Sequence, residues 1–239
     1  KQFFSKTNLA GEIITVNDGS SDDTWKIISK FTDRNILKLN LGENFGKGRA
    51  VKIGVEHAKG NLIFITDVAS PIPFSQLSEL IQYSENWPIV IGARFLTGSK
   101  IYGRRTITRR IVSFALRYFI RKFFLPGIND PQCGFKLFRR DVAGALFAQQ
   151  TIEGFMFDTE VLMRAQRLGL ATKQIPLHSM YDHHDETRIK IKNIRQSLLE
   201  VRSLLSFKKT AWKKAKNNFL WLVHTAHAGG CRLSGPAVF

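Results

Sequence analysis

Cysteine is scarce in this sequence, which holds only Cys133 and Cys231 among its 239 residues. Two cysteines so far apart provide no metal-ligand spacing, and a chain without a disulfide framework is typical of a reducing, cytosolic setting. Long apolar runs are absent as well: no stretch of about 18 apolar residues occurs, so the sequence predicts no membrane-spanning helix. We recognise no secretory signal and no internal repeat.

Acidic residues are few, because 19 Asp and Glu stand against 36 Lys and Arg and give a formal charge of +17. Such an excess of positive charge indicates a polyanionic partner, which can be nucleic acid, anionic lipid or a phosphate-bearing substrate. Hydrophobic residues make up 44% and charged residues 23% of the chain, which is the balance of a globular protein rather than a disordered one. The length suits one α/β domain with an appendage.

Short segments rich in β-branched residues alternate with helical patterns in the first part of the chain. Predicted strands cover residues 12–18, 36–41, 62–67 and 88–94, and predicted helices cover residues 24–31, 48–58 and 73–83. This alternation is typical of βαβ units and predicts an α/β fold with a mainly parallel sheet. Residues 1–11 resemble the end of a helix. Because a doubly wound sheet normally has a strand before such a helix, we expect the first strand to be missing from this sequence.

Two basic regions follow, residues 100–140 with the single acid Asp130 and residues 188–216 with the single acid Glu200. In the first region the periodicity predicts a basic amphipathic helix over residues 107–124. Its polar face is predicted to hold Arg109, Arg110, Ser113, Arg117 and Arg121, and its apolar face Ile111, Val112, Ala115, Leu116, Tyr118, Phe119 and Phe123. We therefore predict a main domain over residues 1–186, a basic helical extension over 187–225 and an irregular tail over 226–239.

The segment VNDGSSDDT, residues 16–24, places Asn17 and Asp18 at the end of a strand and before a glycine turn. In an open α/β sheet, ligands bind outside the carboxyl ends of the strands, where a carboxylate can accept hydrogen bonds from a nucleobase or ribose. The same residue types are also favoured in a capped turn for purely local reasons. Both interpretations fit this segment when it is taken alone.

The segment NFGKGRA, residues 44–50, places glycines on both sides of Lys47 before a helix. Such an arrangement occurs where a helix N-terminus binds phosphate. The spacing of a P-loop is absent, however. An ordinary turn from loop to helix is the simpler explanation of this segment alone.

Asp67 ends an apolar strand and precedes a turn with two prolines. A carboxylate in this position can hold a metal ion or a sugar nucleotide, but such sites usually have a second carboxylate two residues on. Here that position is Ala69, so the acidic site is incomplete. The cluster DHHDE, residues 182–186, is interpreted as a solvated charged loop rather than a metal site.

Further acidic residues lie in two later segments. The segment NDPQCGFKLFRRD, residues 129–141, contains Asp130 and Gln132 before a turn glycine and a strand. The segment EGFMFDTEVLMRAQRLG, residues 153–169, contains acids that begin an amphipathic helix, where they also suit the helix dipole. Each signal is modest when it is considered separately.

The order of these segments is more specific than any one of them. VNDGSSDDT, NFGKGRA, FITD, GAR, DPQCGFKLF and GFMFDTEVLMRA follow one another along the chain. In this order they resemble the family 2 inverting glycosyltransferases, and most closely the branch that glycosylates polyprenyl or dolichyl phosphate. The resemblance covers roughly residues 10–190. It implies a Rossmann-like nucleotide-sugar-binding domain and transfer of a hexose from a UDP-glucose or GDP-mannose type donor.

The resemblance also implies roles for the residues that match the family's donor motifs. Asp18 and Asp22 match carboxylates around the base and ribose, with Asn17 where the family usually has Asp, and Lys47 is assigned to the nucleotide. Asp67 matches the first carboxylate of the metal site, and Ala69 replaces the second. The resemblance thus implies a divalent cofactor, Mg²⁺ or Mn²⁺, whose binding we expect to be weakened.

On the acceptor side, Asp130 and Gln132 match the segment beside the reacting sugar and are assigned as catalytic. Arg94, Arg109 and Ser113 match positions that bind the acceptor's phosphate. Positions 109 and 113 are one helical turn apart, so that a guanidinium and a hydroxyl can converge on one phosphate group.

A lipid phosphate acceptor gives the basic helices a function. A helix with aromatic residues on one side and arginines on the other can lie in a membrane interface, and each Lys or Arg near an anionic surface contributes about 1 kcal/mol. We therefore expect a peripheral association with the cytoplasmic face of a membrane, unless a missing segment spans it. The alternative is that the helix over residues 107–124 packs its apolar face on the sheet and solvates its arginines.

Three functions compete on this basis. The first is inverting transfer, in which the lipid phosphate attacks the anomeric carbon. The second is a catalytically impaired relative that binds nucleotide or membrane as an interaction module, because the second carboxylate is Ala69. The third is nucleic-acid binding through the positive charge, which we do not expect because carboxylates at a sheet edge repel a phosphate backbone.

Overall fold

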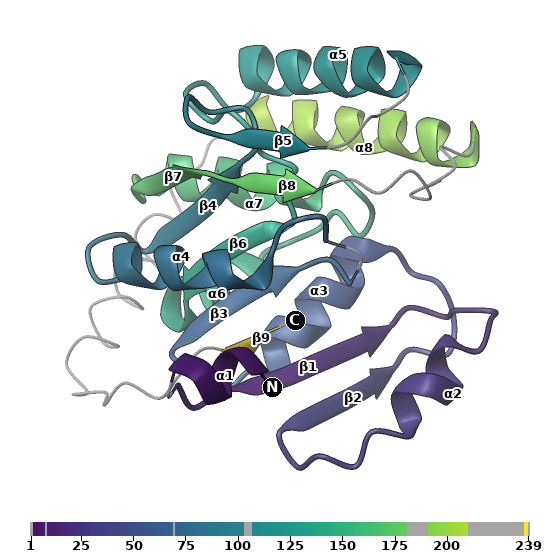
Figure 1. Cartoon of the computed structure of the whole chain (residues 1–239). Coiled ribbons are helices and arrows are strands. Elements are labelled where there is room, and N and C mark those ends of the chain that lie inside the picture. The colour runs from purple at the N-terminus through teal and green to yellow at the C-terminus, as the bar shows by residue number, and fades with distance from the viewer. Residues whose placement is uncertain are drawn as a thin grey trace.

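The computed structural model describes residues 2–7, 9–68, 70–102, 107–180, 191–209 and 237–238. Its centre is a seven-stranded sheet in the order β2-β1-β9-β3-β6-β4-β7 (Figure 1). These strands are β1 (Glu12–Asn17), β2 (Ile36–Asn40), β3 (Leu62–Thr66), β4 (Ile89–Ala93), β6 (Phe135–Arg139), β7 (Thr172–Pro176) and β9 (Ala237–Val238). Strand β6 pairs antiparallel with β3 and β4, whereas the other pairings are parallel. The predicted α/β fold with a mainly parallel sheet is confirmed.

Helices cover both faces of the sheet, and a small parallel pair, β5 (Lys100–Tyr102) and β8 (His178–Met180), lies beside it. The helices are α1 (Gln2–Thr7), α2 (Thr24–Ser29), α3 (Lys47–His57), α4 (Leu77–Ser84), α5 (Ile107–Phe123), α6 (Arg140–Ala148), α7 (Phe157–Arg167) and α8 (Ile191–Lys209), with a 3₁₀ turn at Phe74–Gln76. Within the part of the chain that the structure describes, no helix is long and apolar enough to span a bilayer.

The core is divided into two layers by the alternation of side chains along the strands. In β3, Ile63 and Ile65 belong to one buried cluster with residues of α3, α6 and α7, while Phe64 belongs to the other. This second cluster contains Leu77 and Leu80 of α4 and receives the phenylalanines of α1. Every residue of β4 is buried, as expected for a central strand covered on both faces.

The predicted irregular tail over 226–239 is wrong at its end, because Ala237 and Val238 form β9. This strand pairs with β1 on one side and with β3 on the other, parallel to both. Without a strand between them, β1 and β3 would leave backbone groups unpaired in the middle of the sheet. The two residues of β9 pair with some of these backbone groups on each side. Residues 226–236 lie outside the described residues.

Helix α5 is observed at Ile107–Phe123, within the predicted residues, and only part of its predicted apolar face packs against the core. Ile120 is buried and Leu116 and Phe119 pack against the core, whereas Ile111 and Tyr118 are 62% and 56% exposed. The exposed face also includes Val112, Phe114 and Phe123. The side chains of Arg109 and Arg110 lie outside the described residues. The helix therefore packs through a mixed face and leaves aromatic and β-branched side chains in contact with solvent.

Helix α8, in the predicted basic extension, is attached to the main domain. The carboxylate of Glu200 accepts a hydrogen bond of 2.9 Å from the backbone N–H of Met156, and Leu204 is buried in the core. Near the end of the helix, Lys208 donates a hydrogen bond of 2.7 Å to the carbonyl of Phe123. Figure 1 shows α5 and α8 together at the same end of the molecule, beyond β4 and β7.

Candidate active site

Most of the residues singled out by the sequence meet at one edge of the sheet. Asp18, Asp67 and Arg94 follow the carboxyl ends of β1, β3 and β4. Because β6 runs antiparallel to its neighbours, its beginning lies at this same edge, as the pairing of Thr66 with Phe135 shows. Helices α3 and α7 also begin near this edge, since Lys47 and Asp158 in their first turns pair with residues of it.

Asp18 joins two loops of the predicted donor site. Its carboxylate accepts hydrogen bonds of 2.9 Å from the backbone N–H groups of Phe45 and Gly46 and one of 3.2 Å from the side chain of Asn44. The neighbouring Gly19 has a φ of 64°, and a Cβ there would collide with the backbone of Glu43 and Asn44. The segments VNDG and NFGK thus depend on each other, and Asp18 has a structural role whether or not it contacts a ligand.

Asn17 and Asp22, which belong to the same segment as Asp18, stabilise the same turn. Buried Asn17 donates a hydrogen bond of 2.8 Å to Asn40, which links the ends of β1 and β2. Asp22 accepts a hydrogen bond of 3.0 Å from the backbone N–H of Thr24, at the start of α2. Hydrogen bonds with the side chain and backbone of Thr24 lower the pKa of Asp22. The turn interpretation of this segment therefore holds in the structure.

The glycines of NFGKGRA allow this segment to pack closely against the loop before α7. Gly46 has a φ of 113°, and a Cβ there would lie 2.6 Å from the carbonyl oxygen of Glu153. A Cβ on Gly48 would lie 2.7 Å from the carbonyl oxygen of Ile152 and from Cβ of Phe157. These glycines let the start of α3 approach the loop before α7, and this approach places Lys47 beside the acidic residues of the site.

Lys47 and Asp67 form an ion pair, with 2.6 Å between Nζ and Oδ1. Burial alone would lower the pKa of Lys47, but the charges of Asp158 and Asp67 outweigh it and raise that pKa. On its other side, Asp67 lies against Gly134, where a Cβ would collide with the carboxylate. A glycine at position 134 is therefore required for Asp67 to occupy this place.

A buried ion pair lies behind Lys47. Lys136 on β6 and Asp158 on α7 are 2.6 Å apart, and both are almost fully buried. The ammonium of Lys136 also donates a hydrogen bond of 2.5 Å to the carbonyl of Cys133. Burial, followed by the charge of Asp130, raises the pKa of the Cys133 thiol to about 12. The thiol is thus neutral, and the charges around it are those of the ion pairs.

Asp130 and Arg94 form the next ion pair along this edge. Arg94 donates hydrogen bonds from its backbone N–H, Nε and Nη2 to the carboxylate of Asp130, at 3.0, 2.7 and 3.0 Å. Burial alone would raise the pKa of Asp130, but the hydrogen bonds and charge of Arg94 lower it below its usual value. Gln132, the other predicted catalytic residue, is partly buried and donates to the sulfur of Met156 at 3.7 Å.

Arg117, which the sequence placed on the basic face of α5 without assigning it to the site, lies near the Asp130–Arg94 pair in the structure. Its guanidinium stacks on the ring of Phe95, 3.6 Å from the centroid. Burial lowers the pKa of Arg117, the nearby charges of Arg121 and Arg94 act in the same direction, and the charge of Asp130 opposes them. The charges of Asp130 and Arg94 thus act on Arg117, which lies near that ion pair. Ser113, which the sequence did assign to the site, lies one helical turn before Arg117, and this spacing could have indicated the position of Arg117.

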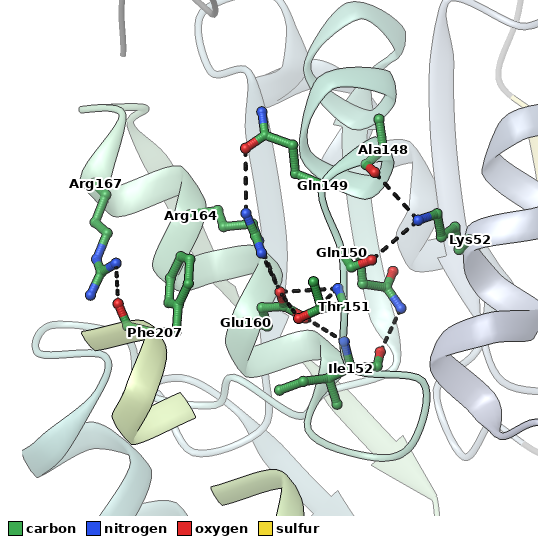
Figure 2. Close-up of polar contacts among 10 residues, drawn as sticks. All are labelled: Lys52, Ala148, Gln149, Gln150, Thr151, Ile152, Glu160, Arg164, Arg167 and Phe207. Carbon is green, nitrogen blue, oxygen red and sulfur yellow. Dashed lines mark hydrogen bonds and ion pairs between the residues drawn. The ribbon is translucent and has the colours of Figure 1, made fainter. Parts of the chain in front are cut away.

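A second polar network fixes the first turn of α7 (Figure 2). The buried carboxylate of Glu160 accepts hydrogen bonds from the backbone N–H groups of Thr151 and Ile152, the latter at 2.8 Å, and pairs with Arg164. Arg167 donates a hydrogen bond of 2.6 Å to the carbonyl of Phe207 at the end of α8. The loop before α7 and the helix itself are thereby held together, which positions Asp158 for Lys136.

The described residues do not supply a complete set of ligands for the predicted divalent ion. Among the described residues, no group of three His, Cys, Asp or Glu side chains could hold a metal. The one predicted ligand, Asp67, is paired with an ammonium. Position 69 lies outside the described residues, and an alanine offers no side-chain oxygen. The cluster at 182–186 also lies outside them.

The charged cluster lies at the carboxyl edge of the sheet, which is where open α/β proteins bind their ligands. Residues 1–147 match glycosyl transferase family 2, and the chain belongs to that family. A dolichyl-phosphate beta-glucosyltransferase of Trichomonas vaginalis is 30% identical over 85% of this chain and 64% of its own length. Another, from Dictyostelium discoideum, is 32% identical over 70% of this chain and 54% of its own length. The chain thus spans less than two thirds of these relatives.

A solved structure shows a similar fold. Glucosyl-3-phosphoglycerate synthase from Mycobacterium tuberculosis, in complex with Mn²⁺, UDP-glucose and glycerol 3-phosphate, has a TM-score of 0.53 and 16% identity. The match covers 84% of this chain and 81% of that one. The resemblance to family 2 and the predicted fold class are therefore confirmed.

Proposed function

We propose that this protein transfers glucose from UDP-glucose to dolichyl phosphate at a membrane surface, with inversion at the anomeric carbon. Relatives with 30% and 32% identity are dolichyl-phosphate beta-glucosyltransferases, and a protein of similar fold binds UDP-glucose. The observation that carries the proposal is that two clusters with basic side chains lie at one sheet edge. One contains Lys47, and the other contains Arg94 and Arg117.

In this proposal the donor lies on the β1–β3 side of the edge. The turn that contains Asn17, Asp18 and Asp22 faces the nucleoside, and Lys47 faces the diphosphate. Sugar nucleotides bind in this way at the carboxyl ends of strands, and an ammonium at a helix start suits phosphate oxygens. Asp67 holds the ammonium in place through its 2.6 Å contact.

The acceptor phosphate lies on the β4 side, near Arg94, Ser113 and Arg117, with Arg109 in the same helix. Arg94 pairs with the carboxylate of Asp130, and the charge of Asp130 also acts on the nearby guanidinium of Arg117. Guanidinium groups that lie close together in this way can bind an anionic phosphate. Asp130 acts as a positioning residue for Arg94, and Gln132 lies beside the reacting sugar.

The reaction is a single displacement. An oxygen of the lipid phosphate forms a bond to the anomeric carbon while the bond from that carbon to the diphosphate breaks, and UDP departs with the electron pair. A phosphate acceptor is already ionised near neutral pH, so that no base has to remove a proton. Positioning and neutralisation of charge then supply most of the catalysis.

Membrane association belongs to the same proposal. The exposed apolar residues of α5, which include Ile111, Phe114 and Tyr118, lie beside Arg121 and Lys122. An apolar face flanked by basic residues suits the interface of an anionic membrane, here the cytoplasmic face. The inward face of the same helix carries Arg117, so the lipid phosphate would be received where the membrane meets the site.

The test is a transfer assay with radiolabelled donors and vesicles that contain dolichyl phosphate. We expect label from UDP-glucose to enter the lipid fraction and label from GDP-mannose to remain in water. Transfer from GDP-mannose alone would overturn the choice of donor. Binding of UDP-glucose without any transfer would favour the alternative of a catalytically impaired relative, which the replacement of a family carboxylate by Ala69 supports.

A further inference from the structure

We propose that the ammonium of Lys47 is the cation that neutralises the donor's diphosphate, so that nucleotide binding by this chain needs no divalent metal ion. This inference rests on the proposed function, because it concerns the same donor site. It starts from the disagreement between that site's residues and the metal expected of its family.

The ammonium of Lys47 competes with a metal ion for Oδ1 of Asp67. With 2.6 Å between Nζ and Oδ1, the ammonium occupies the space in front of that oxygen where an ion would bind at about 2.0–2.1 Å for Mg²⁺. The carboxylate is also restricted on its other side, because it lies against the backbone at Gly134.

The surroundings keep the ammonium in the site. Gly46 and Gly48 allow the start of α3 to pack closely against residues 152–157. Asp158, whose charge also acts on Lys47, is itself paired with buried Lys136 at 2.6 Å. Asp67 is thus the carboxylate that pairs with Lys47 directly, and it takes one of the three N–H donors of an ammonium.

The same geometry suits a diphosphate. An ammonium is a compact positive charge that can donate to several phosphate oxygens. Its place at the first turn of an eleven-residue helix adds the positive end of the helix dipole. An internal cation held by Asp67 therefore does for the leaving UDP what a bound metal does elsewhere: it neutralises charge at the departing oxygens.

The experiment is calorimetric titration of the purified chain with UDP, once in excess EDTA and once in Mn²⁺. We expect the two dissociation constants to agree within about twofold. Since a hydrogen bond to a charged group contributes about 1.5–3 kcal/mol, Lys47→Met should weaken UDP binding at least about tenfold in both buffers. Lys59→Met, which removes the same charge from an exposed position beyond the other end of α3, should leave it unchanged.

Three other results would overturn the inference, and only one of them would also overturn the proposed function. Binding in Mn²⁺ that disappears in EDTA would overturn the inference and leave the proposed function intact. Unchanged UDP affinity in Lys47→Met, with an unchanged melting temperature, would also overturn it. Absence of UDP binding in both buffers would overturn the proposed function and this inference with it. The wild-type comparison decides the question even if a variant fails to fold.

Discussion

At the scale of single residues, Asp130 gives the clearest pH dependence. Arg94 lowers the pKa of this buried carboxyl below its usual value, which is about 3.9. The ionised form therefore stabilises the fold above about pH 3.9, and that stabilisation is lost as the pH falls through the lowered pKa. Asp130→Asn leaves Arg94 without its partner and should reduce the free energy of unfolding by about 3–5 kcal/mol near neutral pH.

Denaturant titrations from about pH 7 down to about pH 3 check this prediction. The difference between wild type and Asp130→Asn should shrink at the acid end. Asp141→Asn is a suitable control, since Asp141 makes only a loose contact of 4.0 Å with Arg139. A difference in stability that is constant over the whole range would contradict the assigned role of the ion pair.

Arg117 belongs to the acceptor side by its position near Asp130 and Arg94. Arg117→Gln removes one charged donor, so KM for dolichyl phosphate should rise about tenfold or more. The affinity for UDP should not change, because Lys47 serves the donor. Steady-state kinetics with calorimetry measure both. Lys59→Gln, at an exposed position beyond the end of α3, provides the control. An equal loss of donor and acceptor affinity would instead indicate a structural role for Arg117.

Residues at strand ends were the ones that the sequence could identify. Asp67 and Asp130 follow recognisable motifs, and the structure places both at the carboxyl edge. The pair of Lys136 and Asp158 could not be predicted, because the two residues are separated by 22 positions and each alone is typical of a solvated face. Whether a charge is buried depends on its partner, and that partner is set by the pairing of β6 with its neighbours.

At the scale of elements, helix α7 depends on the Glu160 network. Glu160→Gln leaves buried Arg164 without its counter-charge, and we expect a loss of about 3–5 kcal/mol in the free energy of unfolding. Glu153→Gln breaks only a half-exposed pair with Arg49 at 3.6 Å, which is worth about 0–1 kcal/mol. Urea denaturation compares the two. Equal effects would show that the network does not stabilise α7.

Helix α5 is expected to bind membranes through its exposed apolar face. Phe114→Glu together with Tyr118→Glu should reduce binding to anionic vesicles strongly in a sedimentation assay. Part of the binding should also fall with salt, since Arg121 and Lys122 are screened over a Debye length of about 8 Å at physiological ionic strength.

Phe31→Glu is the matched control for this helix. Phe31 is 53% exposed and follows α2, at the opposite end of the molecule from α5 (Figure 1). It should leave vesicle binding unchanged. Equal loss in the control and in the α5 variant would contradict a membrane role for this face.

The positions of the elements were predictable from periodicity, but their environment was not. The helix predicted over 107–124 is observed at Ile107–Phe123. Its periodicity separates two faces but does not show which face packs against the domain. In the structure, Arg117 stacks on Phe95 and lies near the charge of Asp130. Strand β9 was missed because two residues carry no periodicity, and only the space between β1 and β3 gives them a structure.

At the scale of the whole molecule, donor and acceptor clusters share one edge of one sheet, and a helix with an apolar outer face adjoins the acceptor side. In the proposed function, the lipid phosphate attacks the sugar from the side opposite the departing UDP. The configuration of the product is therefore the most direct consequence of the proposed function.

The decisive measurement is the anomeric configuration of the lipid product, determined by nuclear magnetic resonance after incubation with UDP-glucose and dolichyl phosphate in vesicles. Because the donor has the α configuration and one displacement inverts it, we predict a β-linked glucosyl phosphate on dolichol and an equal amount of UDP. An α-linked product, or free glucose without a lipid product, would contradict the proposed transfer.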